Sequence, residues 1–132
     1  MSIQLSNIEI ILYVSDVETS KEFYKKLFRM NPILDLSTIS EFSITANFKI
    51  GLMSNNSIAK IVSKELPHPN EGNGIPRCEL YLNVNNIESE YKNAINSGAK
   101  LLSPILDRDW GDRVCYFADP DGHIIAFAEK IK

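Results

Sequence analysis

The sequence has few of the residues that form structural metal sites and disulfide bonds. It contains only two cysteines and two histidines in 132 residues, and Cys78 and Cys115 lack the C-x-x-C spacing of zinc sites. Both cysteines fall within apolar stretches, where we expect small core side chains and not nucleophiles. These absences argue against a disulfide framework and favour a reducing, cytoplasmic setting.

Long apolar runs and clustered positive charge are also missing. The longest apolar run near the N-terminus, 10–14, is far shorter than the roughly 20 residues of a membrane-spanning helix, and no basic segment precedes it as in a signal peptide. With a formal net charge of −3 and scattered lysines, the chain has no basic stripe for a phosphate backbone. We therefore expect a soluble, unprocessed protein with neither a membrane nor a nucleic acid as its partner.

The chain does contain an internal repeat. Residues 8–18 read Ile-Glu-Ile-Ile-Leu-Tyr-Val-Ser-Asp-Val-Glu, and residues 78–88 repeat this pattern, so that Glu9 corresponds to Glu79. Each copy begins with a short, mainly apolar run that predicts a strand and ends where a helix is predicted to start. The chain therefore consists of two related halves.

The first half predicts a β-α-β-β-β order. A strand at 8–14 is followed by Ser15 and Glu18 at capping-box spacing, which predicts a helix that ends before Asn31-Pro32. Phe23, Tyr24, Leu27 and Phe28 form the apolar stripe of that helix. Three further short strands are predicted at 33–36, 42–45 and 48–53.

A segment rich in proline and glycine, about 57–76, links the halves and includes a weak helical pattern at 57–66. In the second half, Asn85 and Glu88 match the first capping pair, and Gly98 is placed to end the helix. Its strands are predicted at 77–84, 100–103, 114–118 and 123–129. Because each half alone is small for an independent domain, we expect modules of about 5–56 and 77–132 to share one core in a single domain, 1–132.

This doubled plan resembles the vicinal-oxygen-chelate superfamily, which includes glyoxalase I, fosfomycin-resistance enzymes, extradiol dioxygenases and bleomycin-resistance proteins. The resemblance rests on Leu-Tyr-Val-Ser-Asp-Val at 12–17 followed by Phe23-Tyr24, and on Tyr-Phe-Ala-Asp-Pro-Asp-Gly-His at 116–123, which contains a type I turn sequence. It implies an α+β fold of two β-α-β-β-β modules that form an open mixed-sheet trough around a pocket. It also implies a homodimer, because members of this superfamily commonly pair.

The resemblance implies that metal ligands come from the first and last strands of each module. In this sequence those positions are Glu9, Glu79, Gly51 and Ala126, and the last two carry no ligating side chain. The usual set of three or four ligands is therefore incomplete, and a divalent metal such as Mg²⁺, Mn²⁺, Ni²⁺ or Zn²⁺ would depend on the two glutamates.

The two glutamates leave three functions open. Strand alternation turns Glu9 and Glu79 toward the trough, where two carboxylates repel each other unless a cation or a shared proton intervenes. They could serve as metal ligand and catalytic base in a lyase or isomerase resembling lactoylglutathione lyase. They could instead form the acidic pocket of a metal-free, small-molecule-binding protein of the bleomycin-resistance type, which is the function we predict. In the third case they point to solvent or pair with Arg77, Arg108 or Arg113.

Residues for the ligand pocket follow from the same alternation and from the loop before a second-half strand. In that loop, Trp110 and Arg113 could grip an anionic or aromatic ligand, or Trp110 could simply cover the edge of the core. His123 is expected to be structural and His68 to be solvated. The predicted pocket residues are Glu9, Tyr13, Glu79, Tyr81, Trp110, Arg113 and Ala126.

Overall fold

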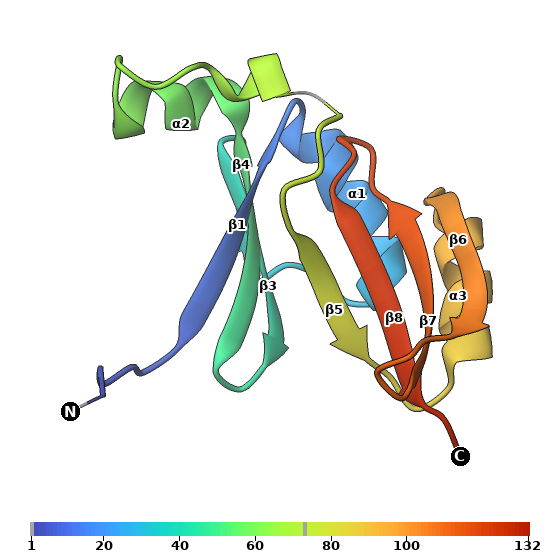
Figure 1. The fold of residues 1–132 in the computed structure, drawn as a ribbon. Helices are drawn as coiled ribbons and strands as arrows, with labels where there is room; N and C mark the ends of the chain where they lie inside the picture. The colour runs from blue at the N-terminus through green and yellow to red at the C-terminus, as the bar shows by residue number, and fades with distance from the viewer. Residues whose placement is uncertain (1, 73) are drawn as a thin grey trace. The chain divides into compact units, whose positions relative to one another are not determined.

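The computed structural model describes residues 2–72 and 74–132, and the chain divides into two compact units, the first ending at Gly72. Each unit is one β-α-β-β-β module with a four-stranded mixed sheet, so the predicted two-module α+β fold is confirmed (Figure 1). The division falls within the predicted linker, in which Asn73 lies outside the described residues. None of the described helices has the length and apolarity that crossing a membrane requires.

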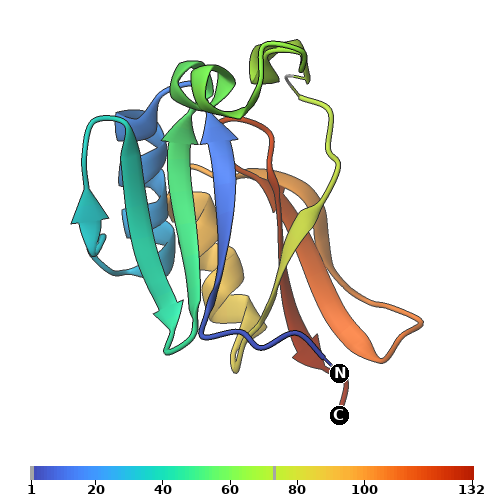
Figure 2. The same cartoon turned by 90° about the vertical axis from the view of Figure 1, so that its left-hand side faces the viewer.

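The first unit has strand order β1-β4-β3-β2, with β1 parallel to β4 and the other pairs antiparallel (Figure 2). Helix α1 packs against β3 and β4, and the Phe28 ring lies 5.8 Å from the ring of Phe42. Leu12, Val14 and Tyr24 are buried with them, as the apolar pattern predicts. The described elements of this unit are β1 (Ile8–Val14), α1 (Val17–Phe28), β2 (Leu34–Asp35), β3 (Ile39–Thr45), β4 (Phe48–Ser54), α2 (Asn55–Val62) and the 3₁₀ helix η1 (Pro69–Gly72).

The start of α1 differs from the prediction by one residue, and its end has a local cause that was not predicted. Asp16, and not Ser15, is the N-cap residue, and its carboxylate accepts a hydrogen bond of 2.5 Å from the Thr19 hydroxyl. At the other end, Arg29 adopts a left-handed conformation with φ of 52°, which ends the helix before Asn31-Pro32 is reached.

The α2 helix and η1 are joined by side-chain hydrogen bonds. Asn55 Nδ2 donates to Asn70 Oδ1 at 2.6 Å, and His68 Nε2 lies 2.9 Å from Asn56 Oδ1. The helix occupies Asn55–Val62 instead of the predicted 57–66, because the hydroxyl of its N-cap residue Ser54 accepts a hydrogen bond from Ser57 N at 3.0 Å. The His68 ring has protein partners instead of water alone.

The second unit has strand order β5-β8-β7-β6, with β5 parallel to β8. Helix α3 packs on β6, β7 and β8, and Asn86 caps it by accepting a hydrogen bond from Ser89 N at 3.1 Å, so the predicted cap at Asn85 is wrong by one residue. Gly98 has φ of 96° after the helix, as predicted. The elements are β5 (Glu79–Asn83), α3 (Ile87–Asn96), β6 (Lys100–Asp107), β7 (Asp112–Ala118) and β8 (Ile124–Lys130).

The two cysteines have different environments. Cys115 is buried in the core, as predicted, and burial raises the pKa of its thiol to about 11. Cys78 is exposed, so its assignment to the core is wrong. The reason is that β5 begins at Glu79, two residues later than predicted, which leaves Cys78 outside the sheet.

Candidate functional site

Two glutamates meet on the face of the first sheet that is opposite α1. Gly51 of β4 is paired in register with Glu41 of β3 on one side and with Ile11 of β1 on the other. Glu9 is two residues before Ile11 in β1 and therefore points to the same face of the sheet. Glu9 and Glu41 thus lie diagonally opposite each other across Gly51. A Cβ atom at Gly51 would lie 2.5 Å from Glu9 Oε2. The missing side chain is therefore what allows the Glu9 carboxylate to lie over β4 beside Glu41.

This position changes the acidity of Glu9. The pKa of Glu9 is raised to about 7, chiefly by burial and then by the hydrogen bond to Glu41 and the negative charge of Glu41. The positive charge of Lys49 acts in the opposite direction and lowers this pKa. Glu9 Oε2 is buried and has no hydrogen-bond partner among the described residues. A carboxyl group with a pKa near 7 is partly ionised at neutral pH and can accept or donate a proton there.

Glu41 is a site residue that the sequence analysis missed. An ideal two-residue turn between Thr45 and Phe48 would pair Glu41 with Leu52, whose side chain is buried on the opposite face. A β-bulge between Ser43 and Thr45 shifts the register by one residue, which pairs Glu41 with Gly51 instead. No sequence signal marks that bulge.

The other predicted residues of the first unit are less closely grouped. Tyr13 lies further along β1 on the same face as Glu9, is paired with Met53, and is 41% exposed. Glu9 belongs to the first unit and Glu79 to the second, so their convergence stays a prediction.

Three aromatic side chains gather on the face of the second sheet that is opposite α3. Tyr81 of β5 and Tyr116 of β7 are both paired in register with Ala126 of β8, and both pack on a buried floor. Trp110, in the turn between β6 and β7, donates from Nε1 to the Tyr81 hydroxyl at 2.8 Å. We call Tyr81, Trp110 and Tyr116 the aromatic face. Its floor consists of Val114, Ala126 and Ala128.

A buried carboxylate fixes the hydrogen bonds of the aromatic face. The Tyr81 hydroxyl donates to Asp112 Oδ2 at 2.6 Å, and Lys130 Nζ lies 3.1 Å from Asp112 Oδ1. The hydrogen bond from Tyr81 is the largest cause that lowers the pKa of Asp112, and the hydrogen bond from Lys130 is the second. Burial is the largest cause that raises the pKa of Tyr81, and its hydrogen bond to Asp112 is the second. Tyr81 therefore stays a protonated donor, and the chain runs from Trp110 through Tyr81 to Asp112.

Glu79 adds negative charge near the aromatic face. Its side chain is exposed at the start of β5. Burial is the largest cause that raises the pKa of Tyr116, and the negative charge of Glu79 is the second, while the positive charge of Arg108 lowers this pKa. The structure therefore places four of the residues named from the sequence, Glu79, Tyr81, Trp110 and Ala126, on or beside this face. Tyr116 and Asp112 were not predicted as site residues.

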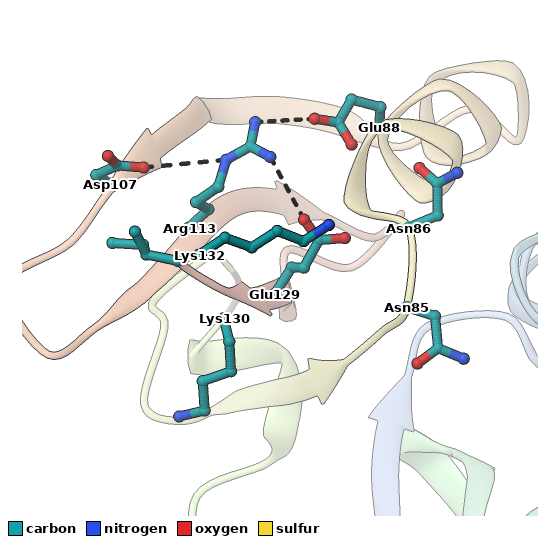
Figure 3. A pocket seen from close by; sticks show the side chains of 9 residues that line it. Asn85, Asn86, Glu88, Asp107, Arg113, Glu129, Lys130 and Lys132 are labelled. Atoms are coloured by element: carbon teal, nitrogen blue, oxygen red, sulfur yellow. Dashed lines mark hydrogen bonds and ion pairs between the residues drawn. The ribbon is translucent and has the colours of Figure 1, made fainter.

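Arg113 does not lie with Trp110. Alternation along β7 sends its side chain to the opposite side from Val114, where it pairs with Glu88 at 2.9 Å, Glu129 at 3.4 Å and Asp107 at 3.9 Å (Figure 3). This corrects the predicted grouping of Arg113 with the ligand pocket. The carboxylates raise the pKa of Arg113, with the hydrogen bond to Glu88 as the largest cause. The groove around it, about 550 Å³, is also lined by Asn85, Asn86, Lys130, Ile131 and Lys132.

Comparison with known proteins decides the family. A family model described as a glyoxalase-like domain matches residues 7–132. The chain belongs to this glyoxalase-like family. The uncharacterized protein YraH of Bacillus subtilis is 32% identical to it over 121 residues, which are 89% of this chain and 93% of that protein.

Solved structures share the glyoxalase-like fold. A glyoxalase-related enzyme from Fulvimarina pelagi has a TM-score of 0.81 at 23% identity, over 97% of this chain and 89% of that chain. A glyoxalase/bleomycin resistance protein/dioxygenase from Nocardioides has a TM-score of 0.80 at 19% identity, over 100% of this chain and 87% of that chain. The predicted membership of the vicinal-oxygen-chelate superfamily is confirmed.

The glyoxalase-like fold implies a divalent metal, but the closing-strand positions of this chain do not fit the usual ligand set. Ala126 is fully buried beneath Tyr81 and Tyr116, and the space at Gly51 holds the Glu9 carboxylate. Within the described residues, no three His, Cys, Asp or Glu side chains gather closely enough to hold a metal ion. The chemistry that these side chains do support is ligand binding in the second unit and proton transfer in the first.

Proposed function

We propose that this glyoxalase-like protein binds a small organic molecule on the aromatic face of its second unit. The observation that carries the proposal is the hydrogen-bonded chain from Trp110 through Tyr81 to Asp112, which holds two aromatic rings in place above a buried floor. Rings that are fixed before binding lose little conformational entropy when a ligand packs on them. The indole of Trp110 is 54% exposed, so a ligand can reach it.

The chemistry of this face favours a planar or aromatic ligand. Tyr81, Trp110 and Tyr116 offer ring surfaces for stacking, and the exposed Glu79 gives the site the acidic edge that the sequence predicts. Because the floor at Ala126 is small and closed, the aromatic rings and the charges around them are the groups that select the ligand.

Trp110 provides a direct test, because it is the one tryptophan in the sequence. A panel of planar organic compounds, cationic, neutral and anionic, is titrated into the protein while Trp110 emission is followed. We expect saturable quenching or a spectral shift with at least one compound, and weaker binding by Tyr81→Phe, in which the indole loses its acceptor. Tyr91→Phe, on α3, is the matched control. No saturable response from any compound would refute the proposal.

A second candidate function is proton abstraction by Glu9 in a lyase or isomerase, and its pKa of about 7 is the observation that favours it. The test is solvent deuterium exchange at carbon atoms next to the carbonyl groups of small aldehydes and ketones, followed by NMR with and without added Mg²⁺, Mn²⁺, Ni²⁺ or Zn²⁺. We expect exchange that Glu9→Gln abolishes and the exposed-site control Glu65→Gln leaves unchanged. Exchange that persists in Glu9→Gln would exclude Glu9 as the base.

We also propose a cytoplasmic homodimer. Two observations support it: β1 is an edge strand whose Ile8 and Ile10 are 51% and 38% exposed, and Cys78 is an exposed free thiol. An exposed apolar edge strand favours pairing with another chain, and free thiols persist in reducing compartments. Light scattering of the purified protein, with Ile10→Lys as the variant expected to dissociate, tests the dimer.

A further inference from the structure

Arg108 is held rigidly at the aromatic face. Its Nη2 donates to Ser103 Oγ at 3.0 Å, to Pro104 O at 3.3 Å and to Val114 O at 2.8 Å. Its Cζ lies 5.3 Å from the centroid of the Tyr116 ring. The guanidinium therefore has a fixed position beside one of the rings that form the aromatic face.

The turn that carries Arg108 also carries Trp110. Arg108 N donates to Asp112 O at 2.8 Å, and Gly111 N donates to Arg108 O at 3.2 Å, with Gly111 at a φ of 94°. These backbone bonds close the turn between β6 and β7. The guanidinium and the indole are therefore positioned by the same few residues.

The charge of Arg108 lacks an acidic partner. Among the described residues no carboxylate forms an ion pair with it, whereas Arg113 in the same unit has three. Its Nε is buried and has no acceptor among those residues. An arginine side chain stays protonated, and a shielded donor without an acceptor is rare and costly in proteins. A carboxylate ligand would supply both the opposite charge and a hydrogen-bond acceptor for this side chain.

We infer that Arg108 determines ligand specificity by binding the carboxylate of an aromatic ligand whose ring packs on Trp110 and Tyr116. This inference rests on the proposed function, because it names the ligand class of the same site. Glu79 and Arg108 act on Tyr116 with opposite charges, so a carboxylate is attracted to Arg108 and repelled by Glu79. The two charges thereby set the direction in which the ligand lies.

The test compares benzoate with benzamide, which have nearly the same shape and differ in charge. Both are titrated into the full chain while Trp110 emission is followed. We expect benzoate to bind about 10-fold or more tightly than benzamide, as one charge-assisted hydrogen bond provides. Arg108→Gln should remove this preference by weakening benzoate binding far more than benzamide binding. Lys92→Gln, on the exposed side of α3, makes the same change in net charge and should keep the preference.

The outcomes separate the inference from the proposed function. Equal binding of benzoate and benzamide by the unaltered protein, or a preference that survives in Arg108→Gln, overturns the role of Arg108 and leaves the aromatic face as a binding site. If no planar compound of any charge alters Trp110 emission, both are overturned. If Arg108→Gln does not fold, as judged by circular dichroism, Arg108→Lys and the salt dependence of benzoate binding replace it, and a preference that salt does not weaken overturns the inference.

Discussion

The raised pKa of Glu9 predicts how the free energy of unfolding depends on pH. Its pKa is about 7 in the folded protein and is expected near 4.5 in the unfolded chain. Below the lower value the carboxyl is protonated in both states and has no effect. Between the two values the folded state holds a proton that the unfolded state has lost, so stability falls as pH rises, and above about 7 the loss is complete.

The magnitude follows from the size of the shift. One pKa unit corresponds to about 1.4 kcal/mol, so the shift of Glu9 lowers the free energy of unfolding by up to about 3 kcal/mol between acidic and slightly alkaline pH. In Glu9→Gln the side chain stays neutral, and we expect this part of the pH dependence to disappear. Other groups titrate in the same range, and those that do not interact with Glu9 are common to both proteins and cancel in the comparison, whereas Glu41 is coupled to Glu9.

The assay is urea unfolding followed by far-UV circular dichroism at several pH values from about 5 to 8, the range in which the proton is lost. Gly51→Ala should give an intermediate result, because its Cβ would displace the Glu9 carboxylate toward solvent. Glu65→Gln, at an exposed position of the same unit, should behave like the unaltered protein. The reasoning is refuted if the unaltered protein and Glu9→Gln lose stability equally over this range.

Two further predictions concern the second unit. Tyr81→Phe removes the hydroxyl between Trp110 and Asp112 and should cost about 1 kcal/mol, the net value of a hydrogen bond, together with a shift of Trp110 emission; unchanged urea unfolding and emission would contradict it. Thiol titration should modify the exposed Cys78 quickly and the buried Cys115 only after unfolding, and rapid modification of both in the folded protein would show that the core around Cys115 opens.

Most of the local structure could be predicted because it depends on neighbours in the chain. The strand at Ile8–Val14 has the predicted bounds, and Gly98 follows the end of α3 in a left-handed conformation as expected. The caps at Asp16 and Asn86 were both missed by one residue in the same direction, because in each copy the helix begins at the apolar residue, Val17 or Ile87, that follows the cap.

The candidate site could be predicted only in part. Alternation put Glu79 and Tyr81 on one face of their strand, and regular pairing of β5 with β8 then places Tyr81 beside Ala126, a position that only the family resemblance had indicated. The same alternation, applied to the loop before β7, would have separated Arg113 from Trp110, and the prediction failed because the strand was expected to begin at 114 instead of at Asp112.

The sequence by itself determined the two-module plan, because a repeated pattern of apolar and polar residues specifies each strand and helix from local preferences. It also determined that Gly51 and Ala126 carry no ligating side chain and so leave space beside them. Only the tertiary structure decided what fills those spaces: the Glu9 carboxylate beside Glu41 in one unit, and two tyrosines in the other. The physical reason is register, since a single β-bulge in β3 decides which residue Glu41 faces, and pairing between strands is a property of the folded sheet.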